Sequence, residues 1–376
     1  MSTADPLVLE MAHKFAQERL APGAAAREKA AAIEPEIIAE LGELGFLGAT
    51  TSAAWDGSEL DAVTYALALE EIAAGDGSVS TILSVHNSVG CVPILKFGSE
   101  EQKQRFLKPM AAGEMLACFC LTEPGAGSDA AAIKTSAKRH GNRWVLNGAK
   151  QFITSGQNAR VAIVFAVSDP AAGRKGISAF IVPTDTAGYR VARLEHKLGQ
   201  RASDTAQLVF EDMELTPDLM LGQEGEGYRI ALSNLEGGRI GIAAQSLGMA
   251  RAAYEAALAY AQERETFGRK IIEHQAVAFR LADMATQLAA ARGLILDAAE
   301  RRDDGEPCLQ QAAMAKLFAS EMAERVCSDA IQIHGGYGYL ADFPVERIYR
   351  DVRVCQIYEG TSDIQRLVIA RELQKG

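Results

Sequence analysis

Hydrophobic and polar positions along the 376 residues follow three successive patterns. Up to about residue 115 the pattern is helical, with segments such as 36–47 and 62–73 rich in Ala, Leu and Glu. The first helix is expected to begin with Asp5 as N-cap and Pro6 in its first turn, and to stop at Pro22-Gly23. We therefore expect an N-terminal α domain over residues 1–117.

Between residues 116 and 215, short runs of β-branched and aromatic residues alternate with turn residues. The pair Asn147-Gly148 inside residues 143–154 predicts a hairpin turn between two strands. Further strands are predicted over 161–167, 176–182 and 207–210. Because no long helix separates these strands, an antiparallel sheet or barrel is favoured over a βαβ array. We expect a middle antiparallel β domain over residues 118–224.

Helical periodicity returns after residue 225 and continues to the end of the sequence. Long helices with Ala-, Leu- and Met-rich faces are predicted over 239–263, 275–301 and 310–333. Such faces are typical of a helix bundle that also packs against other subunits. The chain is thus expected to be an α+β multidomain protein that ends in a four-helix-bundle-like α domain over residues 225–376.

Composition narrows the functional classes. Hydrophobic residues make up 48% of the chain and charged residues 23%, as in ordinary soluble proteins. The net charge of -11 argues against nucleic acid as the main partner, and no apolar run reaches membrane-spanning length. The six cysteines suit a reducing compartment, and no signal or transit peptide is recognisable. We expect a cytoplasmic protein, or a mature organellar matrix protein without its presequence.

Several chemistries lack their usual motifs. The six histidines show no metal-ligand spacing, so no metal site is expected. There is also no P-loop, no G-x-S-x-G elbow and no kinase motif set. Hydrolases and phosphotransferases are therefore disfavoured.

The segment from Phe119 to Ser128 contains a glycine loop after a predicted strand. Its glycines let backbone N–H groups approach a ligand, and the hydroxyls of Thr122 and Ser128 can meet ring heteroatoms or phosphate oxygens. The loop suits a nucleotide-like cofactor. It also matches the Rossmann pattern G-x-G-x-x-A, but the acidic residue that holds a ribose is missing. An ordinary Gly-rich turn is the alternative.

Glu359 lies between an apolar run and the predicted start of a helix. Ser362 followed by Gln365 forms a capping-box pattern. The buried face of this helix is expected to carry Ile364, Leu367 and Val368. Ile357 and Tyr358 could desolvate the Glu359 carboxylate and raise its pKa toward the range of a base, with backbone N–H groups free to polarise a carbonyl. The alternative is a solvated glutamate in a capping loop.

Two further segments could grip a pyrophosphate. Residues 264–269 close a long helix with a phenylalanine between two arginines, and residues 332–338 close another with glycines. From spacing alone, the alternative of helix C-caps with arginines that complement the dipole is slightly favoured.

Taken together, these segments resemble the acyl-CoA dehydrogenase family over nearly the whole chain, most closely its short-chain and short-branched-chain members. The segments that carry the resemblance are 121–129, 239–245, 266–268, 274–275, 335–338 and 357–362. The resemblance implies an α, β, α three-domain fold, FAD as cofactor, acyl-CoA as substrate, electron-transferring flavoprotein as partner and a homo-oligomer, usually a tetramer.

The resemblance also implies a role for individual residues. Glu359 would be the catalytic base. Residues that would contact FAD are Phe119, Leu121, Thr122, Gly127, Ser128, Phe152, Ile153, Thr154, Thr361 and Asp363. Residues that would reach the FAD of a neighbouring subunit are Arg264, Phe267, Gln275, Gln332, Ile333, Gly335 and Gly336. Residues that would contact acyl-CoA are Ser128, Glu236, Gly238, Arg239 and Gly360.

The implied reaction is α,β-dehydrogenation, in which Glu359 takes the α proton while the β hydride passes to the flavin. Two local departures from the family pattern are Phe152, where relatives commonly have Trp, and the loop over residues 51–58. The alternatives are an oxygen-using flavin oxidase of the same fold, a non-catalytic flavin-binding protein and a nicotinamide-dependent dehydrogenase.

Overall fold

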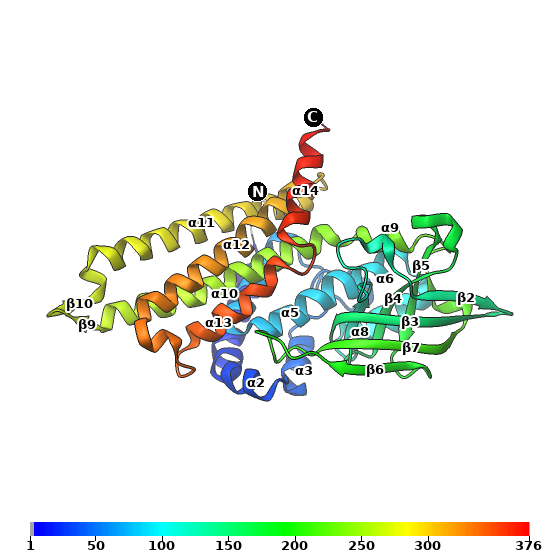
Figure 1. Cartoon of the computed structure of the whole chain (residues 1–376), viewed down its shortest axis with the longest axis horizontal. Coiled ribbons are helices and arrows are strands. Elements are labelled where there is room, and N and C mark those ends of the chain that lie inside the picture. Colours follow the sequence, from blue (N-terminus) through cyan, green and yellow to red (C-terminus); the bar gives the residue numbers. More distant parts are fainter. Residues whose placement is uncertain (1–3, 376) are drawn as a thin grey trace.

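The computed structural model describes residues 4–375, and its elements follow the expected order of helices, strands and helices (Figure 1). The N-terminal helices are α1 (Pro6–Phe15), α2 (Ala24–Ala30), α3 (Pro35–Glu43), α4 (Ala62–Gly75), α5 (Gly77–Val85), α6 (Val92–Phe97), α7 (Glu100–Gln102) and α8 (Lys108–Ala111). Asp5 caps α1 as predicted, with its side chain accepting from Leu7 N–H. The predicted stop at Pro22-Gly23 is wrong, because Ala21–Gly23 forms a 3₁₀ turn that leads directly into α2.

The middle segment forms an eight-stranded sheet with strand order β6-β7-β3-β2-β4-β5-β8, and β1 pairs with β4 off this path. The strands are β1 (Ala117–Cys120), β2 (Ser136–His140), β3 (Arg143–Thr154), β4 (Val161–Val167), β5 (Ile177–Pro183), β6 (Tyr189–Leu194), β7 (Thr205–Leu215) and β8 (Met220–Leu221). Most pairings are antiparallel as predicted, but β4 pairs in parallel with β1 and β2.

The predicted hairpin at Asn147-Gly148 is wrong. Residues 143–154 are one strand, β3, and the hairpin turn lies before it at Gly141, between β2 and β3. Gly148 instead lies at a register shift of β3 against β7, and a Cβ there would lie 2.4 Å from Thr135 Oγ1. The glycine is required by this close approach and not by a turn.

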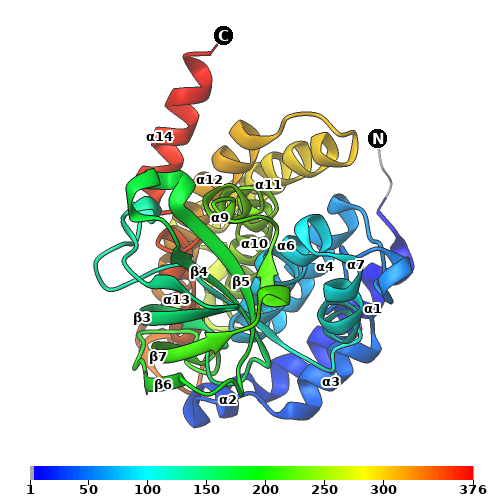
Figure 2. The ribbon, with the colours of Figure 1, turned by 90° about the vertical axis from the view of Figure 1, so that its right-hand side faces the viewer.

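The C-terminal helices are α9 (Gly227–Leu232), α10 (Leu235–Glu263), α11 (Gln275–Asp303), α12 (Leu309–His334), α13 (Pro344–Val352) and α14 (Ser362–Leu373). The long helices α10, α11 and α12 pack side by side, and α13 packs against α10 and α12 (Figure 1). The short strands β9 (Glu265–Thr266) and β10 (Arg269–Lys270) form a tip at the end of this bundle opposite the sheet. Helix α14 projects away from the body (Figure 2).

Two hydrophobic cores hold these elements together. The larger core joins the N-terminal helices to α10, α11, α12 and α13, with α4 packed directly on α10. The second core fills the sheet and includes apolar side chains from the segment 91–110. The stretch Gly77–Phe97 is long and apolar enough to cross a membrane, but 83% of its most apolar window is buried inside the structure. In this fold it is a core segment.

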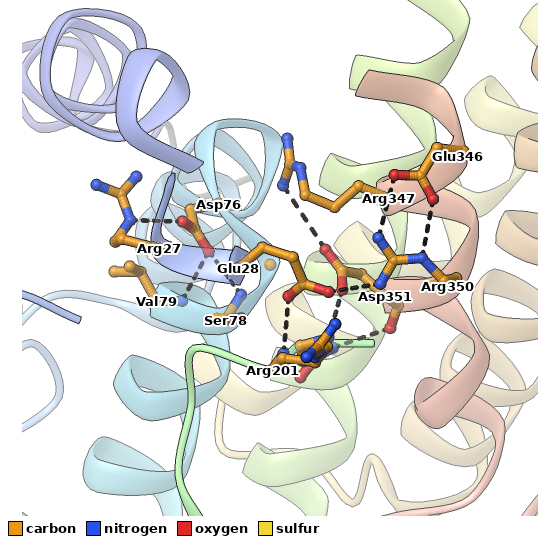
Figure 3. A network of polar contacts seen from close by, with 12 residues as sticks. Arg27, Glu28, Asp76, Ser78, Val79, Arg201, Glu346, Arg347, Arg350 and Asp351 are labelled. Carbon is orange, nitrogen blue, oxygen red and sulfur yellow. Dashed lines mark hydrogen bonds and ion pairs between the residues drawn. The ribbon is translucent and has the colours of Figure 1, made fainter. Parts of the chain in front are cut away.

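A network of charged side chains ties the three parts together (Figure 3). Arg27 on α2 donates to Asp76, which caps α5. Glu28 pairs with Arg350 on α13 and accepts from the backbone of Arg201. Asp351 accepts from the backbone N–H of Gln200. The chain segment that leads from α13 to Glu359 is therefore fixed to both other parts of the molecule.

Candidate active site

Glu359 lies in a left-handed turn between α13 and α14. Its φ is 54° and that of Gly360 is 90°. A non-glycine residue in this region is uncommon and is held there only when its surroundings determine it. The N-cap of α14 is Thr361, whose hydroxyl accepts from Ile364 N–H. The predicted capping box of Ser362 and Gln365 is therefore wrong.

Gln365 does not cap α14 but binds the backbone of the Glu359 turn. Its side-chain amide donates to the carbonyl oxygens of Glu359 (3.2 Å) and Gly360 (2.9 Å). Lys316 on α12 also donates to the Gly360 carbonyl, at 2.7 Å. Within residues 4–375 the backbone N–H of Glu359 makes no hydrogen bond. With its carbonyls held on one side, the turn leaves this donor free for a ligand.

The Glu359 carboxylate is in a desolvated position. Burial raises its pKa above the ordinary glutamate value, while the positive charges of Arg239 and Lys316 act in the opposite direction. Ile357 was expected to shield the carboxylate, but its side chain is half exposed, and the hydroxyl of Tyr358 is bonded instead to Gln245 on α10 at 2.6 Å. Leu367, expected on the buried face of α14, is exposed.

Helix α10 brings Gly238 against the carboxylate. A Cβ at Gly238 would lie 2.9 Å from Oε2 of Glu359 and 3.1 Å from its Cδ. The next residue, Arg239, is 4% exposed, and in the described part of the chain its Nε and Nη1 atoms have no hydrogen-bond partner. Unpaired buried guanidinium donors are costly, so they point to a missing acceptor at this site. Glu236 lies one turn earlier and is partly exposed.

The glycine loop after β1 is anchored by a buried ion pair that the sequence did not reveal. Glu123 accepts from the backbone N–H groups of Lys134 and Thr135 and from Lys150 Nζ at 2.8 Å. Lys150, fully buried on β3, also donates to the Leu121 carbonyl at 3.0 Å. This anchor fixes both ends of the loop between Leu121 and Thr135.

The tip of this loop is open. A Cβ at Gly125 or Gly127 would meet no atom within 4 Å, and Ser128 is exposed. These glycines are not required by contacts within the chain, so the open space in front of their backbone suits a ligand that approaches closely. Phe119 and Leu121 are partly buried on the strand side of the loop.

Phe152 stands beside the loop in an unusual conformation. It has φ of 59°, lies at a register shift of β3 against β7, and is 64% exposed. The preceding residue donates its backbone N–H to the Thr122 carbonyl, which joins β3 to the loop. The side chain of Ile153 points into the sheet core, so a ligand would meet its backbone only. An exposed aromatic ring next to an open glycine loop can stack on a planar ring system.

The remaining predicted cofactor residues lie elsewhere. Arg264 and Phe267 are at the β9–β10 tip, far from the sheet (Figure 1). A cleft of 390 Å³ at this end is lined by Arg264, Ile333, Gly335 and Gly336 among others, and Phe267 is 97% exposed. Gln275 begins α11 nearby, and Gln332 is exposed at the end of α12. One chain therefore does not bring this group to Glu359, whereas Thr361 and Asp363 lie directly after it.

A metal site was not expected from the sequence. Within residues 4–375 no group of three or more His, Cys, Asp or Glu side chains could hold a metal ion.

Lys316 was missed because a lysine in an Ala-rich helix resembles a surface residue. Its spacing with Ala312, Ala319 and Ala323, which share one helix face, would have placed it inside.

The chain is similar to known proteins over nearly its whole length. Three family models match, described as the acyl-CoA dehydrogenase N-terminal domain (residues 3–114), middle domain (118–213) and C-terminal domain (225–374). The human mitochondrial short-chain specific acyl-CoA dehydrogenase is 47% identical over 98% of this chain and 89% of its own length. An acyl-CoA dehydrogenase of Bacillus subtilis is 46% identical over 98% of both chains.

Solved structures agree with this result. Butyryl-CoA dehydrogenase from Megasphaera elsdenii matches with a TM-score of 0.97 at 42% identity, over 100% of this chain and 99% of that chain. A chain from work on the electron transferring flavoprotein of Acidaminococcus fermentans matches with a TM-score of 0.98 at 45% identity, over 100% and 99%. A glutaryl-CoA dehydrogenase of Mycobacterium smegmatis solved in complex with FADH2 matches at 0.93 and 34%, over 98% and 94%. The chain belongs to the acyl-CoA dehydrogenase family.

Proposed function

We propose that this FAD-dependent enzyme dehydrogenates short straight or branched acyl-CoA thioesters and that Glu359 is its catalytic base. The observation that carries the proposal is the Glu359 turn, which places a desolvated carboxylate and a free backbone N–H next to each other. The carboxylate can accept a proton while the N–H donates to a carbonyl oxygen. An α proton of a thioester is weakly acidic, so a base and an oxyanion donor are needed together.

The chain's own residues perform the proton transfer. The raised pKa makes Glu359 a stronger base than a solvated glutamate, and its fixed left-handed backbone directs the carboxylate toward the space in front of Gly238. The Glu359 N–H stabilises the negative charge that develops on the thioester oxygen. Arg239, with two unpaired donors, and Glu236 are proposed to flank the CoA part of the substrate.

The loop at residues 119–128 and the strand around Phe152 are proposed to hold the flavin of the same subunit, with Thr361 and Asp363 completing the site. Bound FAD supplies the acceptor for the β hydride. Fit to this cofactor is supported by the open backbone at Gly125 and Gly127 and by the exposed ring of Phe152. The group at Arg264, Phe267, Gln275 and 332–336 is proposed to reach the flavin of a neighbouring subunit.

The preference for a short chain is supported by the face of α10 that begins at Gly238. Gly241 and Gln245 continue this face one and two turns further on. At the second turn, buried Gln245 is bonded to the hydroxyls of Thr81 and Tyr358, which fill the space. Seven residues of helix rise about 10 Å, a length that exceeds a butyryl chain but is shorter than an extended palmitoyl chain.

The relatives support proposals for the partners, the assembly and the domain boundaries of this chain. We propose electron-transferring flavoprotein as the electron acceptor and a homotetramer as the assembly. We also propose domain boundaries at 1–117, 118–224 and 225–376, which the three matched models support, and a cytoplasmic location, which the similarity to bacterial enzymes supports.

The test is anaerobic reduction of the bound flavin by acyl-CoAs. Butyryl-CoA or a 2-methyl-branched short thioester should bleach the flavin faster than palmitoyl-CoA; the reverse order would refute the short-chain preference. In Glu359→Gln, FAD and butyryl-CoA should still bind while bleaching slows by about 10² to 10⁴. Bleaching at the wild-type rate would refute the role of Glu359, and rapid turnover in air without an added acceptor would indicate an oxidase.

A further inference from the structure

Lys316 is a fully buried lysine in the middle of α12. Ala312, Ala319 and Ala323, on the same helix face, belong to the larger core. Within residues 4–375 its ammonium group has one hydrogen bond, to the Gly360 carbonyl at 2.7 Å, although it carries three donors.

Burial of an ammonium group with a single neutral partner does not favour folding. The cost of removing the charge from water is several kcal/mol, and a neutral hydrogen bond returns only part of it. A methionine at this position would fill a similar volume without that cost. A structural role therefore does not explain the lysine.

The position of the ammonium relative to Glu359 does explain it. Lys316 holds the Gly360 carbonyl from α12, while Gln365 holds the carbonyls of both Glu359 and Gly360 from α14. Fixed carbonyls keep the two residues in their left-handed conformations, and the free N–H and carboxylate of Glu359 follow from these backbone angles.

We propose that Lys316 is a positioning residue for the reaction: it fixes the Glu359–Gly360 turn through the Gly360 carbonyl and places a positive charge beside the catalytic carboxylate. The proposal rests on the assignment of Glu359 as the base. Gln365 is uncharged and binds the same Gly360 carbonyl. The two contributions of Lys316, geometry and charge, can therefore be separated experimentally.

The charge contribution has a defined direction. The groups that act on Lys316 are Cys355 in the segment before Glu359, Glu359 itself, Arg239 on α10 and Glu321 on its own helix. The groups that act on Glu359 are Arg239 and Lys316. Burial lowers the pKa of Lys316 to about 8, so the residue carries its charge at neutral pH and below. Removal of this charge raises the pKa of Glu359, and the base is then protonated up to a higher pH.

The experiment compares wild type, Lys316→Met and Gln365→Met as FAD-loaded enzymes. Flavin bleaching by butyryl-CoA is followed anaerobically from about pH 5.5 to about pH 9, because burial can move the pKa of a glutamate into this range. Both variants should slow bleaching about 10-fold or more at neutral pH, as expected for a misplaced base. Only Lys316→Met should move the acid limb of the profile to higher pH.

A second measurement does not depend on turnover. The thermal stability of Lys316→Met is compared with that of Lys316→Met/Glu359→Gln, and wild type with Glu359→Gln, over the same pH range. The stability difference within each pair changes as pH rises above the pKa of an unfolded glutamate, and it stops changing at the pKa of Glu359 in the folded protein. This upper limit should lie at a higher pH in the Lys316→Met pair. The melting temperature of Lys316→Met itself should equal or exceed that of wild type.

The outcomes separate the two proposals. If wild type is not bleached by any acyl-CoA, or Glu359→Gln bleaches normally, the base assignment fails first. If wild type bleaches and Glu359→Gln does not, but Lys316→Met shows the wild-type rate and an unmoved acid limb, the role of Lys316 is refuted. Loss of folding in Lys316→Met, with the upper pH limit of the Glu359 stability change unmoved in a Lys316→Gln variant, would also refute it and assign the lysine to structure.

Discussion

At the scale of single residues, the site depends on backbone conformations that local sequence does not favour. Glu359, Phe152 and Phe267 are all left-handed non-glycine residues, and each belongs to a segment that the family resemblance connects with catalysis or cofactor binding. Such conformations cost about 1–3 kcal/mol each and persist where surrounding contacts determine them. For Glu359 those contacts are the bonds from Lys316 and Gln365 to the turn.

Gly238 gives a prediction at this scale. A Cβ at this position would lie 2.9 Å from Oε2 of Glu359, so Gly238→Ala should displace the carboxylate and slow flavin reduction by about 10- to 100-fold. Gly293→Ala is the matched control, because a Cβ at this helical glycine meets no atom within 4 Å. Equal rates for Gly238→Ala and Gly293→Ala would contradict the close contact with the base.

The same contact predicts that the base can be moved. In Glu359→Gly/Gly238→Glu the carboxylate would come from α10 into the space that the Glu359 side chain leaves. Part of the rate lost in Glu359→Gly should return, although the new direction of approach gives a poorer angle to the proton. The measurement is anaerobic bleaching by butyryl-CoA in the single and double variants; a double variant as slow as Glu359→Gly would count against the geometry.

At the scale of elements, the loop after β1 is anchored by buried side chains in addition to its backbone hydrogen bonds. Glu123 and Lys150 are both buried and bind each other, the Leu121 carbonyl and the backbone at Lys134 and Thr135. Desolvation lowers the pKa of Lys150. Burial acts to raise the pKa of Glu123, but the charge of Lys150 and the hydrogen bonds to the carboxylate together lower it below its ordinary value. The pair stabilises one loop conformation in front of which the glycines remain open.

Removal of one partner should therefore release the loop. Lys150→Met leaves a buried carboxylate without its cation, which should lower the free energy of unfolding by about 3–5 kcal/mol and weaken FAD retention. Urea unfolding and the flavin absorbance after gel filtration measure the two effects. Lys138→Met, on exposed β2, is the control. A Lys150→Met protein with wild-type stability and flavin content would disprove the anchoring role.

At the scale of the whole molecule, the charged network of Figure 3 joins the N-terminal helices, the loop before β7 and α13. Burial raises the pKa of Asp351 in this network to about 7. The folded state then binds the proton more tightly than the unfolded state, so stability falls as pH rises from about 4 to about 7.

Asp351→Asn should remove this dependence. As pH rises from about 4, the melting temperature of wild type should fall relative to that of Asp351→Asn. Above about pH 7 the difference between the two should stop changing. Asp185→Asn, at an exposed turn, controls for the loss of one charge. A difference between wild type and Asp351→Asn that is constant over this range would show that Asp351 is ionised throughout.

The position of Arg264 predicts a dependence of cofactor binding on assembly. Arg264 lies at the end of the helix bundle opposite the sheet, beside the cleft lined by Gly335 and Gly336. Arg264→Ala should release FAD more readily, and dilution that dissociates the oligomer should have the same effect. Arg301→Ala, at the other end of α11, is the control. Unchanged FAD affinity in Arg264→Ala would exclude a cross-subunit contact.

The sequence by itself determined the order of the three parts, the long C-terminal helices, the Asp5 cap and the family. Helical periodicity over many residues is a strong local signal, because each turn repeats the same choice between core and solvent. The family segments were equally local, since each consists of a few consecutive residues. The family resemblance of its segment was enough to propose Glu359 as the base.

The tertiary structure decided which conformation some of these segments adopt and which residues they contact. Asn147-Gly148 has the local chemistry of a hairpin turn, but close packing against Thr135 makes it part of one long strand. Ser362 and Gln365 have the chemistry of a capping box, but Gln365 is drawn to the carbonyls of Glu359 and Gly360. In the first case a local preference of about 1 kcal/mol gives way to packing against another segment, and in the second to hydrogen bonds with the Glu359–Gly360 turn.

The contacts that set the chemistry of Glu359 come from Gly238, Arg239 and Lys316, more than 40 residues away in the sequence. Local pattern contains no information about such distances, because desolvation and charge depend on which helices pack together. Glu359 could therefore be proposed as the base from the sequence, whereas its conformation, its pKa and the contact from Lys316 were decided by the packing of α10 and α12 around the turn.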